Sequence, residues 1–354
     1  MLPGLFIHHS GTANFYYATR IKVESALHLY GNDINMLIVP DMEKERAIKE
    51  SCVKEVVSYS EIGYHERLKE FRDSKKALVE SLKCYLKQLK TDKILIPHNF
   101  PAYLAFGLSK AFEVEIVENP FSKLRAVKRK EEIAKIRETC SAILEAFEFL
   151  KGIVRKGKKC EELRNAVELF LFERGFLAED TILASGKLTA FPHFKGEGDV
   201  EEHVVVDIFP KSRTHGYYGD FTRTILIEPE KEIEEMLEAV IEAKQKGIEV
   251  IREGVKARDV HGTVCDVLES YGYKTLRSKS SEGFIHSTGH GVGLEVHEEP
   301  RIFENDDVLK AGMVFTVEPG LYYLKWGGVR VEDTVVVTKR GCEVLTPYPD
   351  RVRL

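Results

Sequence analysis

The sequence predicts a two-domain α/β protein, and three observations support this: its length, its alternation of strand-like and helical segments, and a doubled order of elements. At 354 residues the chain exceeds the usual range for one hydrophobic core. Apolar runs alternate with helical patterns in the first third, and the order helix, helix, strands occurs twice after residue 131. We therefore expect one domain over residues 1–124 and a larger one over residues 125–354.

The composition is that of an ordinary globular protein, with 43% hydrophobic and 31% charged residues. A membrane partner is not expected, because no run of eighteen apolar residues occurs and the N-terminus lacks the regions of a signal peptide. The net charge of −5 gives no indication of a basic surface for nucleic acid, so a nucleic-acid partner is not expected. The six cysteines are dispersed without a C-x-x-C pair, which predicts reduced thiols and a cytoplasmic protein.

Residues 1–124 are expected to surround their own sheet. Apolar runs that resemble strands are Leu5–His8, Met36–Pro40, Val53–Ser58, Ile94–Pro97 and Val114–Val117. Helical patterns follow Asp41 and run through His65–Leu89. The basic stretch Lys123–Lys130 is interpreted as a solvated linker into the second domain.

The larger domain is expected to start with a long amphipathic helix. Apolar residues recur at helical spacing: Ile133, Ile136, Cys140, Ile143, Phe147 and Leu150. A second helix over Glu161–Arg174 stops at Gly175, and strand-like runs follow over Thr181–Ile227. The series then restarts with two helices and further strands: Ile233–Ile248, Val260–Leu268 and Phe284–Thr338. Two structurally similar halves are therefore a hypothesis about architecture, although the halves share no visible sequence identity.

Five ionisable residues of this domain lie in strand-like or glycine-rich segments among apolar neighbours: Asp207, Asp220, His290, Glu318 and Glu332. A lone buried charge would cost roughly several kcal/mol unless it is paired or bound to a metal. Four carboxylates held together would repel one another, and two divalent cations would neutralise them. One imidazole with carboxylates suits Mn, Co, Zn or Fe better than Mg. Two metals that share a hydroxide perform hydrolysis.

The two aspartates are expected on paired strands. Asp207 ends the word H-V-V-V-D, and Asp220 opens D-F-T-R-T-I-L-I, with turn-like residues between them. A hairpin-like pairing would let both carboxylates face one side. A surface ion pair or a turn cap explains either aspartate alone, whereas both facing inward from apolar strands favours a metal site.

The glutamates and the histidine have weaker individual signals. Glu318 closes the word M-V-F-T-V-E before Pro319, which holds it extended. Glu332 lies in V-R-V-E-D, where an ion pair with Arg330 in a sheet is the alternative. His290 stands between two glycines that permit close backbone approach, and a structural histidine would explain this word alone. The ion-pair alternative leaves the second glutamate in a neighbouring segment unexplained.

These five residues and the words around them resemble the metallopeptidases of the pita-bread fold, which include methionine aminopeptidase, aminopeptidase P and prolidase. Residues 283–300, G-F-I-H-S-T-G-H-G-V-G-L-E-V-H-E-E-P, are similar to the proline-specific branch, as are V-E-P-G-L-Y over 317–322 and G-V-R-V-E-D over 328–333. The resemblance covers residues 125–354. It implies a pita-bread catalytic domain with pseudo-twofold symmetry, preceded by a smaller α/β domain like that of creatinase and prolidase.

The resemblance also implies a role for each metal ligand. Asp207 would chelate one metal, and His290 with Glu318 would bind the other. Asp220 and Glu332 would bridge the two.

Further roles follow from the same resemblance. Glu318 would also shuttle the proton of the bridging water. His193 and His297 resemble histidines that steady the substrate and the developing oxyanion. His286 and Arg330 resemble additional site residues of the proline-specific branch.

The implied activity is hydrolysis of the peptide bond before proline by a hydroxide that bridges two divalent metals, Mn or Co first and Zn or Fe as alternatives. The substrates would be short proline-containing peptides, either Xaa-Pro dipeptides or longer peptides, and the expected assembly is a homodimer. Two alternatives stay open: a metal-free creatinase-like amidinohydrolase and a non-catalytic pita-bread binding module. The intact set of ligands counts against both. The 13 positions from Asp207 to Asp220 are more than in typical prolidases, which leaves the preferred substrate length open.

Overall fold

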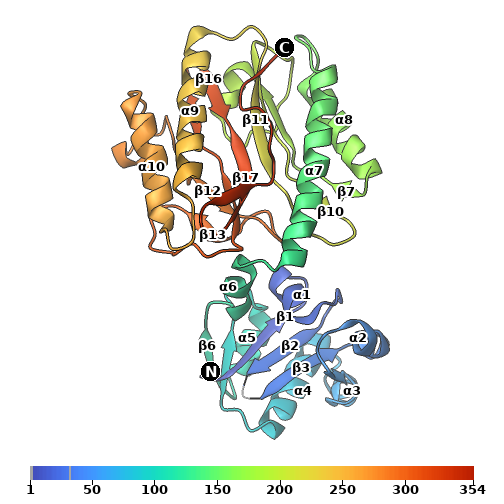
Figure 1. Ribbon diagram of the computed structural model, residues 1–354. Helices are drawn as coiled ribbons and strands as arrows, with labels where there is room; N and C mark the ends of the chain where they lie inside the picture. The colour runs from blue at the N-terminus through green and yellow to red at the C-terminus, as the bar shows by residue number, and fades with distance from the viewer. Residues whose placement is uncertain (1–2, 32) are drawn as a thin grey trace. The chain divides into compact units, whose positions relative to one another are not determined.

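The computed structural model describes residues 3–31 and 33–354. The chain divides into two compact units, residues 1–125 and 126–354, and each has its own main sheet (Figure 1). Within the described ranges, no helix combines the length and the apolar character needed to cross a membrane.

The first unit is built on a six-stranded mixed sheet of order β4-β3-β2-β1-β5-β6. Its strands are β1 (Leu5–His9), β2 (Leu27–Gly31), β3 (Ile34–Val39), β4 (Glu55–Ser58), β5 (Lys93–Ile96) and β6 (Glu113–Ile116). Its helices are α1 (Ala13–Thr19), α2 (Lys44–Glu50), α3 (Tyr64–Phe71), α4 (Ser74–Gln88), α5 (Ala102–Leu108) and α6 (Pro120–Ala126). Apolar residues of α4 and α5, among them Leu82 and Leu104, share one core with the strands.

Two predictions for this region need correction. Strand β2 was not predicted because His28 interrupts its apolar run, yet His28 is buried and hydrogen-bonds His8 at 2.8 Å. The wholly solvated linker is wrong because Arg125 and Lys128 are buried. Arg125 donates to Asn14 at 2.9 Å. Lys128 belongs to the second unit, and its ammonium lies 2.8 Å from the carboxylate of Glu298 in that unit.

The second unit contains the four predicted long helices: α7 (Lys130–Ile153), α8 (Cys160–Glu173), α9 (Lys231–Val250) and α10 (Ala257–Ser270). Helix α8 ends before Gly175, whose positive φ of 86° allows the left-handed turn that stops the helix. In Figure 1, α7 and α8 flank the strands on one side and α9 and α10 on the other. The predicted order of helix, helix and strands in each half is confirmed.

The main sheet of this unit is nine-stranded, with the order β13-β12-β14-β17-β11-β9-β8 and with β18 and β19 beside β17 and β11. Its strands are β8 (Ile182–Ser185), β9 (His203–Asp207), β11 (Phe221–Leu226), β12 (Gly289–Gly291), β13 (Glu298–Ile302), β14 (Val314–Val317), β17 (Glu332–Val337), β18 (Cys342–Val344) and β19 (Val352–Arg353). Two small pairs accompany it: β7 (Phe176–Leu177) with β10 (Lys211–Ser212), and β15 (Gly320–Tyr323) with β16 (Gly327–Arg330). The two halves meet where β11 pairs with β17.

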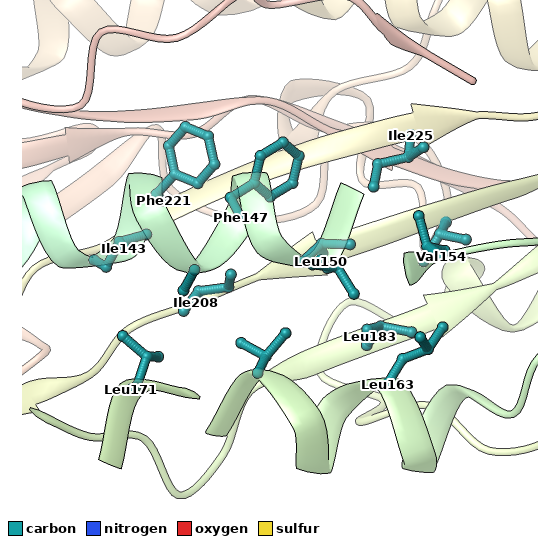
Figure 2. Packing of buried hydrophobic residues seen from close by; sticks show 14 of the residues in the cluster. Ile143, Phe147, Leu150, Val154, Leu163, Leu171, Leu183, Ile208, Phe221 and Ile225 are labelled. Atoms are coloured by element: carbon teal, nitrogen blue, oxygen red, sulfur yellow. The ribbon is translucent and has the colours of Figure 1, made fainter. Parts of the chain in front are cut away.

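Side-chain alternation on these strands separates the core from the candidate site. Figure 2 shows Phe147 of α7 beside Phe221 of β11, and Leu163 of α8 beside Leu183 of β8. Val206 of β9 belongs to the same buried cluster. Because neighbouring strand residues point to opposite faces, Asp207 projects away from this cluster.

Candidate metal centre

Strand pairing around β11 aligns three of the predicted ligands. Asp207 is the last residue of β9 and lies opposite Thr222 of β11. Thr222 in turn lies opposite Glu332, the first residue of β17. Asp220 directly precedes β11, two residues before Thr222, so alternation directs both side chains to one face.

Strand pairing in the second half brings in the remaining two. In the β14–β17 ladder Val317 lies opposite Asp333, and the antiparallel direction therefore carries Glu318 toward Glu332. His290 is the middle residue of β12, which pairs with β14. All five predicted ligands consequently lie on, or directly beside, five adjacent strands of one sheet: β12, β14, β17, β11 and β9.

Four of these residues lie close together. Asp220, His290 and Glu332 each offer a ligand atom, and these atoms all lie within 4.8 Å of one another. His290 Nε2 is 3.6 Å from Asp220 Oδ2 and 3.3 Å from Glu318 Oε1. This group of oxygen atoms around one imidazole is a possible metal-binding site.

Asp207 is held by an arginine. Arg330 donates to Oδ2 of Asp207 at 2.7 Å, so the ion pair considered between Arg330 and Glu332 is not formed. Glu332 instead accepts a hydrogen bond from Thr222 at 2.6 Å. Oδ1 of Asp207 is buried and has no hydrogen-bond partner among the described residues. A buried carboxylate oxygen without a donor is costly, and it is available to a cation.

Burial and mutual repulsion make the acids of this group reluctant to ionise. Burial, then the charge of Glu332, raises the pKa of Asp220 well above its usual range. Burial and Glu318 do the same to the pKa of Glu332. Burial raises the pKa of Glu318 to about 8, with Arg330 opposing the shift and Asp207 adding to it. A divalent cation among these oxygens would remove the repulsion and favour the ionised forms.

The histidine of the group is kept neutral. Burial, assisted by the neighbouring His297, lowers the pKa of His290 to about 3. A neutral imidazole has a lone pair for a metal, so this shift suits a ligand. His290 Nδ1 lies 3.2 Å from the backbone oxygen of Gly291, which leaves Nε2 facing the acids.

A buried tyrosine links two further predicted residues. His286 Nε2 lies 3.0 Å from the hydroxyl of Tyr322, and Arg330 donates to that hydroxyl at 2.9 Å. Burial and then the charge of Arg330 lower the pKa of His286 to about 3, while burial raises the pKa of Tyr322 to about 12. A series of side-chain hydrogen bonds therefore connects His286 to Asp207 through Tyr322 and Arg330.

The other two predicted histidines are exposed. The ring of His297 lies 4.1 Å from that of His290, measured between centroids. His193 follows the 3-10 helix Gly186–Ala190. Burial lowers the pKa of His297, while Asp207 opposes the shift and the neighbouring His193 adds to it. Both side chains thus lie at the solvent-exposed side of the candidate site.

The sequence reasoning assigned no role to Tyr322 or to three threonines beside the acids. Each threonine donates one hydrogen bond: Thr222 to Glu332 (2.6 Å), Thr316 to Glu318 (3.3 Å) and Thr334 to the backbone oxygen of Asp220 (2.8 Å). In the motifs D-F-T, T-V-E and E-D-T each threonine stands two residues from an acid. Because residues two apart in a strand share a face, this spacing could have placed the threonines beside the acids. No such pattern marks Tyr322.

The segment between the two aspartates is more than a turn. Its residues Lys211–Ser212 form β10 and pair with β7, and the backbone N–H of Tyr218 donates to Gly293 at 2.8 Å. The extra length is therefore accommodated by pairing, and it contacts the glycine-rich segment that follows His290.

The chain is similar to known proteins over most of its length. The sequence profile of metallopeptidase family M24 matches residues 134–339. The Xaa-Pro dipeptidase of Pyrococcus furiosus is 37% identical over 243 residues, which are 67% of this chain and 68% of that protein. The Xaa-Pro dipeptidase of Pyrococcus horikoshii is 34% identical over 315 residues, 88% of this chain and 83% of that protein. The solved structure of Xaa-Pro dipeptidase from Bacillus anthracis matches with a TM-score of 0.87 at 28% identity, covering 99% of this chain and 95% of that one.

Proposed function

The chain belongs to metallopeptidase family M24, and we propose that it hydrolyses the peptide bond before proline, in Xaa-Pro dipeptides or at the N-terminus of longer peptides. The resemblance and the pita-bread fold predicted from the sequence are confirmed by the family match and the solved relatives. We assign the chemistry to residues 125–354 and treat residues 1–124 as a separate α/β domain. The observation that carries the proposal is the convergence of Asp220, His290 and Glu332 within 4.8 Å.

We assign two divalent metal ions to this site, Mn or Co first and Zn or Fe as alternatives. Their ligands would be Asp207, Asp220, His290, Glu318 and Glu332. The donor set fits, because carboxylates with one imidazole suit these metals and the buried Oδ1 of Asp207 has no other partner among the described residues. When bound, such ions lower the pKa of water and polarise the carbonyl under attack.

The protein residues then have separable tasks. Glu318, ionised beside the metals, would accept the proton of the attacking water and return it to the leaving amine. His297 and His193 lie on the exposed side and would donate to the developing oxyanion. Arg330 holds Asp207 at 2.7 Å, and His286 contacts Arg330 through a shared tyrosine hydroxyl.

Selection for proline is supported by the relatives. A bond before proline has no N–H, so the enzyme must recognise the shape of the ring instead. The proteins from Pyrococcus furiosus and Bacillus anthracis described above are named Xaa-Pro dipeptidases. These names support cleavage of the bond before proline.

A substrate panel tests this function. Purified protein is stripped with EDTA, reloaded with Mn²⁺ or Co²⁺, and offered Xaa-Pro, Xaa-Pro-Xaa and Met-Ala-Xaa peptides. Cleavage of the first alone identifies a dipeptidase, and cleavage of the second identifies an aminopeptidase of the proline-specific branch. Absence of bound metal together with absence of metal-stimulated cleavage would refute the proposal and favour a metal-free amidinohydrolase or a binding module.

We further propose a cytoplasmic homodimer. Support for the location comes from the cysteines, all six of which are free thiols, as expected in a reducing compartment. The dimer rests on the family resemblance alone. Light scattering of the purified protein tests it, and a monomeric mass at micromolar concentration would contradict it.

A further inference from the structure

A buried network of two cations and two carboxylates lies beside the strand that carries Glu332. Arg223 of β11 donates to Asp333 of β17 at 2.8 Å, and Lys244 of α9 forms ion pairs with both Asp333 and Asp350. The side chains of Arg223, Lys244 and Asp333 are at most 4% exposed. With Asp350, whose side chain is 17% exposed, the two positive and two negative formal charges balance, and each charge depends on the others because little water reaches them.

This network holds the backbone of the candidate metal centre. Arg223 Nη1 donates to the backbone oxygens of Thr222 at 2.9 Å and of Glu332 at 2.5 Å. The hydroxyl of Thr222 in turn donates to the Glu332 carboxylate at 2.6 Å. One guanidinium therefore fixes both the main chain of Glu332 and the residue that orients its side chain. It does so where the two halves of the sheet join.

Most other partners of the network come from residues 346–350, near the C-terminal end of the chain. Arg223 donates to the backbone oxygens of Pro349 at 3.0 Å and of Tyr348 at 2.9 Å. The hydroxyl of Thr346 donates to Asp333 at 3.0 Å. Asp350 supplies the second carboxylate for Lys244. Nothing in this segment hydrogen-bonds the ligand carboxylates directly. Asp350 reaches Glu332 through Lys244, Asp333 and Arg223, and Thr346 also accepts from the backbone N–H of Thr334 at 3.0 Å.

We propose that residues 346–350 are a positioning segment for the metal centre, which sets the metal affinity by fixing Glu332 through Arg223 and Asp333. The inference rests on the proposed function in one respect: Glu332 must be a metal ligand. Groups that orient a ligand without touching the metal commonly change metal affinity or activity by about 10- to 100-fold when they are removed. A network with a purely structural role would change stability alone.

The test is Asp350→Asn in the full chain, compared with Arg351→Ala as the matched control. Arg351 is the next residue, and its pair with Glu238 is exposed. Calorimetric titration of EDTA-stripped protein with Mn²⁺ is expected to show about tenfold weaker binding for Asp350→Asn and no change for Arg351→Ala. The visible spectrum of the Co²⁺-loaded protein is expected to change for Asp350→Asn only, and kcat for an Xaa-Pro dipeptide is expected to fall while KM stays the same.

The outcomes separate this inference from the proposed function. Failure of the unchanged protein to bind Mn²⁺ would refute the function. Normal Mn²⁺ binding by Asp350→Asn would refute the positioning role alone, even if that variant unfolds more easily. Should Asp350→Asn not fold, the charge-neutral double variant Lys244→Met with Asp350→Leu takes its place, because apolar replacement of a buried pair often preserves stability. Weakened Mn²⁺ binding in the double variant supports the inference, and wild-type affinity overturns it.

Discussion

Replacing Glu318 by Gln should stabilise the metal-free protein, and increasingly so as the pH rises. Burial raises the pKa of the Glu318 carboxyl from 4.5 to about 8, with a contribution from Asp207. The folded protein therefore holds this proton more tightly than the unfolded chain does. Stability falls as the pH rises through the window between these two values, and the loss is complete above it. Because Gln cannot ionise, the variant does not lose this stability as the pH rises.

The magnitude follows from the two pKa values. Within the window each pH unit costs about 1.4 kcal/mol. From about pH 5 to about pH 9 the penalty for Glu318 grows by about 4 kcal/mol. The stability difference between Glu318→Gln and the unchanged protein should widen by this amount, while the variant loses peptidase activity when metal is restored.

Urea unfolding followed by circular dichroism in EDTA, at a series of pH values, measures the effect. Glu343→Gln is the control, because Glu343 pairs with Arg137 at the surface and its pKa is lowered by that contact. This control should gain no stability at high pH. A stability difference for Glu318→Gln that stays constant with pH would refute the reasoning that a buried, repelled carboxyl occupies this position.

Three further results are expected. Glu332→Gln should abolish turnover and leave the far-ultraviolet circular dichroism spectrum unchanged, and retained activity would show that the bridging role is misassigned. His297→Ala should lower kcat by about 100-fold with little loss of bound metal measured by atomic emission; equal loss of both would make His297 a ligand. Binding of Mn²⁺ at neutral pH should release protons, because Asp220, Glu318 and Glu332 have raised pKa values in the metal-free protein. Calorimetry in buffers of different ionisation enthalpy measures the release, and a value of zero would contradict the assigned protonation.

The helices of the second unit could be predicted because their signal is local. The spacing from Ile136 to Leu150 marks the buried stripe of α7 without knowledge of any partner. The ligand set could be found for a related reason, since acids among apolar strand residues are unusual wherever they occur. Both inferences need only a short window of sequence.

The contacts that organise the site could not be predicted, because they join residues far apart in sequence. Arg330 faces Asp207 across 123 positions, whereas the sequence suggested its near neighbour Glu332. The buried state of Lys128 depends on Glu298 in the same way. Ion pairs of this kind are decided by which strands adjoin, and the strand order β14-β17-β11-β9 is not visible in any local pattern.

The most direct measurement is the activity of EDTA-stripped protein toward an Xaa-Pro dipeptide as Mn²⁺ is added, with bound metal determined at each point. Hydrolysis should be absent without metal, rise with added Mn²⁺, and reach its plateau when two ions are bound per chain. Cleavage that persists in the stripped protein, or a plateau at one ion per chain, would contradict a site of two metals held by Asp207, Asp220, His290, Glu318 and Glu332.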